Sequence, residues 1–172
     1  NASQIFDRSD ANGRVFLLNP NGIIFGESAR VNVGALVAST LDLSAQDFLD
    51  ENYEFIALDE RFGGIVNLGE ITAAAGGSVS LLGRTVRNEG VIRARYGQVN
   101  WGAGRSATLD FDGDGLLRFE VQQSASQAAV SNSGTLAADG GAVLLTAQAA
   151  DQVLGGVVNN KGIIRAGRIE RR

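Results

Sequence analysis

Histidine and cysteine are absent from the 172 residues of this chain. Without them the sequence has no Ser-His-Asp or Cys-His nucleophilic site, no usual zinc ligand set, no thiol redox centre and no disulfide. Any catalysis would depend on carboxylates, lysine, arginine, tyrosine or serine. Methionine is also absent and the first residue is Asn1, so we expect an internal piece of a longer precursor.

Positive charge and long apolar runs are also scarce. The 15 Lys and Arg residues are outnumbered by 19 Asp and Glu residues, whereas a nucleic-acid surface usually carries a basic patch. No 18 apolar residues follow one another, which excludes a membrane-spanning helix in the sequence given. A hydrophobic fraction of 44% is typical of a globular chain with a continuous core. We therefore expect one domain over residues 1–172, with no nucleic-acid partner.

What the sequence does contain is a repeat of the form V-x-N-x-G-x-I/L-x-A. "IVNLGEITA" and "VRNEGVIRA" place Asn67 and Asn88 at the same position, 21 residues apart. "VSNSGTLAA" and "VVNNKGIIRA" place Asn132 and Asn160 there, 28 residues apart. A recurring unit of this kind, with a period near 21 residues and variable insertions, indicates a repeat architecture.

Each repeat predicts two short strands with alternating apolar residues, separated by Asn and Gly. A unit this small buries its apolar face only by stacking on its neighbours, and a period near 21 suits one rung of a β-helix. We expect Asn67, Asn88, Asn132 and Asn160 to stack as an internal amide ladder, and the glycine two residues later to adopt the left-handed conformation. A β-sandwich is the alternative fold, because it too has many short strands and glycine turns.

Two segments interrupt the period. Residues 42–61 contain seven acids against one arginine, together with the aromatics Phe48, Tyr53 and Phe55. We expect this segment to pack on the outside of the coil through its aromatics and to contain a short helical turn. Residues 109–121, "LDFDGDGLLRFEV", predict a hairpin that turns at residues 112–115.

The only proline lies in "FLLNPNGIIFG", between two short apolar runs. Pro20 fixes its own φ and keeps Asn19 out of the helical region, while Asn21 and Gly22 tolerate positive φ. The stretch therefore predicts a tight turn between two strands.

The order of these motifs resembles a known family. "NGRVFLLNPNGIIFGESARVNVGALVASTLDL", followed by the four repeats and the "LDFDGDGLL" hairpin, is similar to the amino-terminal secretion domain of two-partner-secretion exoproteins, the haemagglutination-activity domain of the filamentous-haemagglutinin family. The resemblance implies a right-handed parallel β-helix with extra-helical hairpins. It also implies export through a dedicated outer-membrane transporter, with an adhesin, haemolysin or contact-dependent toxin encoded downstream.

The resemblance also exposes a departure at both ends. Family domains begin further upstream, with capping strands and another Asn-Pro motif, so we expect this chain to be truncated at its amino-terminal cap. We likewise expect it to stop where the next carboxy-terminal rung begins, and to have the downstream exoprotein repeats as a partner.

For the turn Asn19-Pro20-Asn21-Gly22, two compatible interpretations stay open. The turn shapes the coil, or, as the resemblance implies, it belongs to the signal engaged by the periplasmic (POTRA) domains of the transporter. Those domains would add the unfolded strands to a sheet edge. The side chains that would serve as anchors before folding, and as core residues afterwards, are Phe16, Leu18, Ile24 and Phe25.

This interpretation also sets the location and the folding order. The chain would cross the periplasm unfolded and be secreted to the bacterial cell surface. There, stacking of successive rungs would nucleate folding of the β-helix.

Three further functions are weighed against this one. Asp110, Asp112 and Asp114 begin a calcium-loop pattern, but Val121 stands where a bidentate Glu is needed, which favours a solvated turn over weak calcium binding. The Asp and Glu residues do not align from rung to rung on one face, so the sequence predicts neither an enzyme nor a cofactor. The alternative is an adhesive β-helix that binds a host glycan or receptor through an arginine face, although a scattered solvated surface is favoured. The arginines of that face would be Arg84, Arg87, Arg93, Arg95 and Arg105.

Overall fold

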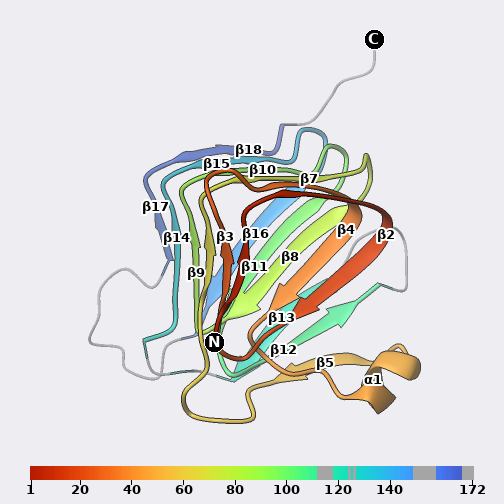
Figure 1. The fold of residues 1–172 in the computed structure, drawn as a ribbon, viewed down its shortest axis with the longest axis vertical. Coiled ribbons are helices and arrows are strands. Elements are labelled where there is room, and N and C mark those ends of the chain that lie inside the picture. The colour runs from red at the N-terminus through yellow and green to blue at the C-terminus, as the bar shows by residue number, and fades with distance from the viewer. Residues whose placement is uncertain (112–117, 124, 126, 149–157, 168–172) are drawn as a thin grey trace.

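The computed structural model describes residues 1–111, 118–123, 125, 127–148 and 158–167, and most of them form a coil of parallel strands (Figure 1). One short helix, α1 (Ala45–Leu49), interrupts the strands, and Ser44 caps it by accepting a hydrogen bond from the Asp47 amide. Among the described residues, no helix has the length and apolar content needed to cross a bilayer.

The third, fourth and fifth turns of the coil each contribute one strand to each of three faces, and in the first two turns one long strand spans two of these faces. The first face is a six-stranded parallel sheet that stacks one strand from every turn. In spatial order its strands are β1 (Ser3–Ile5), β3 (Ile23–Phe25), β6 (Ile65–Asn67), β9 (Thr85–Asn88), β14 (Ala129–Asn132) and β17 (Val158–Asn160).

The second and third faces are joined through the long strands β2 (Arg8–Leu18) and β4 (Arg30–Ser39), which pair with each other in parallel. The first half of β4 pairs with β7 (Glu70–Ala73), and its second half pairs with β8 (Ser78–Gly83). Beyond β7 lie β10 (Val91–Arg93), β15 (Thr135–Ala137) and β18 (Ile163–Arg165), and beyond β8 lie β11 (Gln98–Ala103) and β16 (Ala142–Ala147).

The strand register follows the sequence repeat. Asn67 is the partner of Asn88 across β6 and β9, and Asn132 is the partner of Asn160 across β14 and β17. The predicted parallel β-helix is therefore confirmed, and the sandwich alternative is wrong.

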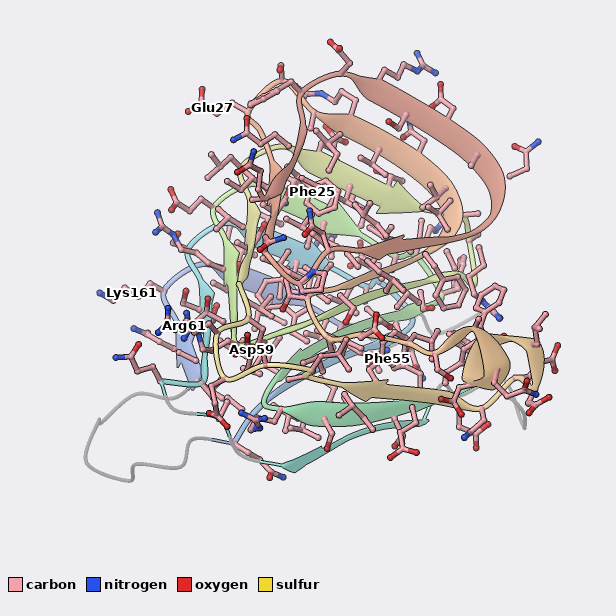
Figure 2. The ribbon with its side chains drawn as sticks, turned by 60° about the horizontal axis from the view of Figure 1, so that its bottom comes forward. Phe25, Glu27, Phe55, Asp59, Arg61 and Lys161 are labelled. Atoms are coloured by element: carbon pink, nitrogen blue, oxygen red, sulfur yellow. The ribbon has the colours of Figure 1, made fainter. Side chains whose placement is uncertain are left out.

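Alternation within the short strands fills the interior of the coil. One column of fully buried side chains on the first face runs through Ile23, Ile65, Val86 and Val130, which are partners in register. Full burial of each such side chain stabilises the fold by roughly 1.5–3 kcal/mol. In Figure 2 the labelled Phe25 also lies inside the coil, while the charged groups of Glu27 and Lys161 point outward.

The two interruptions of the period form a separate antiparallel sheet outside the coil. In this sheet β12 (Ser106–Asp110) lies between β5 (Tyr53–Ile56) and β13 (Arg118–Gln123). The pairing of β12 with β13 confirms the predicted hairpin, although its predicted turn at residues 112–115 lies outside the described residues. The predicted excursion and its helical turn are confirmed by β5 and α1. The sheet lies beside the coil face made by β8 and β11, where both the inward and the outward residues from Val79 to Gly83 are buried.

Candidate functional site: the turn between β2 and β3

The turn Asn19–Gly22 joins the first two rounds of the coil. The Asn19 side-chain oxygen accepts a hydrogen bond from the Asn21 amide at 2.9 Å, and the Asn19 carbonyl accepts one from the Gly22 amide at 3.0 Å. Gly22 has φ of +123°, a conformation that residues with a side chain rarely adopt. The sequence Asn-Pro-Asn-Gly thus supplies a side-chain acceptor, a fixed φ and a glycine where the turn requires them.

The turn is held against two neighbouring segments. The Asn19 amide group donates to the Ser3 hydroxyl at 2.8 Å and to the Asn1 carbonyl at 3.1 Å. On the other side the Gly63 amide donates to the Pro20 carbonyl at 2.7 Å, and a Cβ on Gly63 would lie 2.6 Å from the Asn21 backbone. Folding therefore engages Asn19, while Pro20 and Asn21 stay exposed.

The four predicted anchors have different environments. Phe25 is 1% exposed, as expected of a core residue, and Phe16 is half-buried. For Leu18 and Ile24 the core prediction is wrong, because Leu18 is 36% exposed and Ile24 only half-buried. Successive side chains of a strand point to opposite faces, so the inward Ile23 and Phe25 turn Ile24 outward.

Phe16 is partly covered by the excursion rather than by the coil. Its ring stacks on Tyr53 with a centroid separation of 5.5 Å and meets Phe48 edge-on at 5.2 Å. The predicted packing of the excursion through its aromatics is therefore confirmed. Both aromatics reach the strand that leads into the turn.

An apolar pocket of about 540 Å³ opens beside this aromatic group. Leu18 and Leu43 line it together with Phe48 and Leu49 of α1, and Leu49 is 74% exposed. Sequence reasoning missed this pocket. Its only signal was the apolar pair Phe48-Leu49 in an otherwise acidic segment.

Main-chain pairing leaves β3 no free edge in the folded state. Residues Ile23–Phe25 pair with β1 on one side and with β6 on the other. Another protein can therefore add to this segment as a strand only before the coil closes around it.

At the next corner of the coil, four asparagines form a ladder of side-chain amides. Each amide nitrogen donates to the next asparagine oxygen, at 2.7 Å from Asn67 to Asn88, 2.8 Å from Asn88 to Asn132 and 2.7 Å from Asn132 to Asn160. The first three side chains are buried, so the ladder satisfies groups that would otherwise be costly to bury. Asn160, at the end, is exposed.

The glycines that follow the ladder asparagines do not have the predicted left-handed conformation. Positive φ occurs instead at Gly22, Gly76 and Gly140. At Gly90 a Cβ would lie 2.0 Å from the Gly69 carbonyl oxygen of the rung below. Close backbone approach between stacked turns, not backbone handedness, is the reason for glycine at this position.

The predicted calcium loop falls largely outside the described residues, since Asp112 and Asp114 are not among them. Asp110 ends β12 in register with Arg118. Within the described ranges, no group of three acidic side chains lies close enough together to hold a metal. Weak calcium binding by the hairpin stays a prediction.

The five arginines of the alternative glycan site do not share one face. Arg87 lies on β9 and pairs with Glu89, whereas Arg93 lies on β10 and pairs with Glu70. Arg105 pairs with Glu60 at 2.8 Å. The remaining two, Arg84 and Arg95, lie near the rings of Phe62 and Tyr96. The proposed arginine face is therefore not formed.

The charged end of β2 also connects the first two rounds of the coil. Asn32 donates to Asp10 at 2.8 Å, and Arg8 donates to it at 2.6 Å. These hydrogen bonds, first that of Asn32 and then that of Arg8, hold the pKa of the Asp10 carboxyl below its usual value.

The chain is similar to a known family of domains and to known proteins. Residues 1–172 match the family model of the TPS secretion domain. The heme/hemopexin-binding protein of Haemophilus influenzae strain Rd is 33% identical over 160 residues, which are 90% of this chain and 17% of that protein. A second heme/hemopexin-binding protein of Haemophilus influenzae is 46% identical over 55 residues, 32% of this chain and 6% of that protein.

Among solved structures, the crystal structure of the HMW1 secretion domain from Haemophilus influenzae matches with a TM-score of 0.80 and 32% identity. The match covers 95% of this chain and 41% of that one. This chain therefore spans less than half of the solved domain and a small part of the curated relatives.

Proposed function

This chain belongs to the TPS secretion domain family, and from that premise we propose that its first two rounds of coil carry the signal read by its transporter. Domains of this family engage a dedicated outer-membrane transporter, and TPS exoproteins are secreted across the outer membrane. The chain is thus the secretion domain of a larger exoprotein. The proposal concerns which residues the transporter recognises, and whether it recognises them before or after the chain folds.

The observation that carries this proposal is the double pairing of β3. Its main-chain groups bond to β1 and β6, and Ile23 and Phe25 are buried once the coil has formed. A transporter that recognises the segment by strand addition must therefore meet it unfolded. In the unfolded chain Phe16, Leu18, Ile24 and Phe25 are available as anchors, and Asn19-Pro20-Asn21-Gly22 sets the direction in which the two strands leave the turn.

The partner of the unfolded strands is the set of periplasmic POTRA domains of the transporter. After transit through the periplasm, the chain folds at the cell surface by stacking one rung on the next. The ladder supports this order, because each asparagine needs only the adjacent rung to complete its hydrogen bonds. The terminal strands β17 and β18 then pair with the following repeats of the exoprotein.

The domain acts by binding and folding rather than by catalysis. In this role it needs no cofactor. The Asp and Glu side chains of the excursion form a solvated surface.

Binding of the purified periplasmic domains of the transporter to two forms of this chain tests the proposal. One sample is denatured and diluted immediately before the measurement, and the other is folded beforehand. We expect saturable binding of the unfolded sample alone. Replacing Asn19 and Asn21 by alanine should weaken that binding by about fivefold or more, which corresponds to about 1 kcal/mol.

Asn88→Ala is the matched control, because it removes an asparagine of the ladder and leaves the turn intact. In the unfolded sample it should bind like the natural chain. Equal binding of folded and unfolded chain, or no effect of the Asn19 and Asn21 changes, would contradict the proposal.

A further inference from the structure

A groove of about 410 Å³ runs across the corner where the rounds of the coil turn from the second face to the third. Its floor is made by stacked turns that carry Gly77, Gly97 and Gly141. A Cβ on any of these glycines would lie within 2.0 Å of a carbonyl oxygen in the rung below. The floor is therefore bare backbone because the stacking leaves no room for side chains.

Tyr96 stands on this floor at a position where the neighbouring rounds have glycine. Its φ of +56° matches the +81° of Gly76 and the +77° of Gly140, although a tyrosine adopts this conformation at an energetic cost. The ring is 48% exposed and lines the groove. The Arg95 guanidinium carbon lies 4.7 Å from the ring centroid, and Arg95 donates to the Tyr96 hydroxyl at 3.1 Å.

Within the groove itself, a second guanidinium lies on an aromatic ring. The Arg14 guanidinium carbon is 3.6 Å from the centroid of Phe111. Among the described residues, neither Arg14 nor Arg95 has a carboxylate within ion-pair distance, unlike Arg87, Arg93 and Arg105. The groove is thus lined by the Arg14 guanidinium, and Arg95 lies beside the groove against the ring of Tyr96, so that an aromatic ring orients each of the two cations.

The groove also holds an unused acceptor. The side-chain oxygen of Gln98, which lines it, is buried and has no hydrogen-bond partner in the described part of the chain. Buried acceptors are rarely left unpaired, and a rotation of the Gln98 side chain toward the groove would let this oxygen accept a hydrogen bond from a ligand hydroxyl.

We propose that this groove binds an acidic oligosaccharide. The apolar face of a sugar ring stacks on Tyr96, sugar carboxylates pair with Arg14 and Arg95, and a hydroxyl donates to the Gln98 oxygen. Arg14 lies on the first round and Gly141 on the fifth, so four steps of ~4.8 Å give the groove a length of about 19 Å. That length accommodates several sugar units.

An extended acidic peptide fits the groove less well. The main chain of the floor is engaged between rungs, with the Gln98 amide donating to Gly77 and the Ala142 amide to Gly97. Within each turn, the Gly97 amide donates to Ala94. A peptide would find no free strand edge along which to form a ladder.

This site belongs to the folded chain and does not depend on the proposed transporter signal. The test is calorimetric titration of the folded chain with a hexamer of galacturonic acid, with neutral maltohexaose and with a polyglutamate peptide of similar charge. We expect saturable binding of the acidic hexasaccharide and at least about tenfold weaker binding of the other two, a difference of about 1.4 kcal/mol.

Tyr96→Gly is the decisive variant, because glycine is the residue of the neighbouring rounds and relieves the positive φ. We expect it to fold at least as stably as the natural chain and to bind the hexasaccharide about tenfold more weakly. Arg14→Gln should weaken binding similarly, while Arg87→Gln, on another face, should leave it unchanged.

Three results would overturn the proposal. They are no saturable binding of the hexasaccharide, unchanged binding by Tyr96→Gly and Arg14→Gln, and equal or tighter binding of polyglutamate. The last result would assign the groove to acidic peptides.

Discussion

Asparagine has opposite roles at two corners of this coil. In the ladder, Asn67, Asn88 and Asn132 are buried, and each amide bonds to the same residue of the next round. In the turn between β2 and β3, Asn21 is exposed, and Asn19 bonds within its own turn, to Asn1 and to Ser3 of β1.

The difference shows how position in the stack decides what an amide side chain does. An amide that repeats in register finds its partner in the neighbouring rung and contributes to stability. An amide at the start of the coil has no repeated partner, so it shapes a local turn and stays partly or fully exposed. Four predictions break or sharpen this contrast.

The largest effect is expected for Asn88→Ala in the middle of the ladder. The change removes the bonds to both Asn67 and Asn132 and leaves buried polar atoms unpaired. We expect the free energy of unfolding to fall by about 2–4 kcal/mol, measured by urea denaturation. Asn160→Ala, at the exposed end, should cost less than about 1 kcal/mol. Similar losses at the two positions would contradict a buried ladder.

The next effect is expected for Gly90→Ala. Its Cβ would lie 2.0 Å from the Gly69 carbonyl oxygen, so the stacked turns must separate. We expect a loss of about 2–3 kcal/mol in the same urea measurement. Gly76→Ala is the matched comparison, because its Cβ meets nothing within 4 Å and only the φ of +81° is unfavourable. That change should cost about 1 kcal/mol, and a larger cost than Gly90→Ala would refute close approach as the main constraint.

A smaller effect is expected for Asn19→Ala. It removes the acceptor for the Asn21 amide and the bond to the Ser3 hydroxyl. Because Asn19 is only half-buried, we expect a loss of about 1 kcal/mol in the free energy of unfolding. Asn21→Ala should change stability by less than about 0.5 kcal/mol, since a surface substitution of this kind removes little. An unfolding midpoint lowered more by Asn21→Ala would argue against this description of the turn.

The smallest effect is expected for Asp10→Asn and depends on pH. The folded pKa of Asp10 is lowered below 3.8 by Asn32 and Arg8, so its contribution to stability is present above 3.8 and is lost as pH falls through the folded pKa. Thermal unfolding of the natural chain and the variant should therefore converge as the pH falls below 3.8 and through the folded pKa. A difference that grows on acidification would have the wrong sign.

Much of the fold could be predicted because the repeat pairs with itself. The spacing from Asn67 to Asn88 is also their register in the sheet, so period, strand positions and ladder follow from the sequence. The side to which each anchor points was harder to predict. Ile24 and Leu18 are as apolar as Ile23, and only the phase of the strand decides which of them is buried.

The outer surface could not be predicted in the same way. The excursion brings Tyr53 onto Phe16, and the hairpin brings Phe111 under Arg14, although none of these residues belongs to the repeat. Arg87 and Arg93 likewise pair with the carboxylates of Glu89 and Glu70, and the sequence did not predict that these pairs would occupy the two arginines.

The sequence alone therefore determined the strand content, the rung length, the amide ladder and the absence of histidine and cysteine chemistry. The first three depend on local alternation and on a repeat whose partner is its own next copy, and the last follows from composition alone. The tertiary structure decided which side chains meet outside the coil, including the pocket beside Leu18 and the groove of Arg14 and Tyr96. Those contacts join segments of different lengths and from different rounds, and no sequence period encodes how such segments pack.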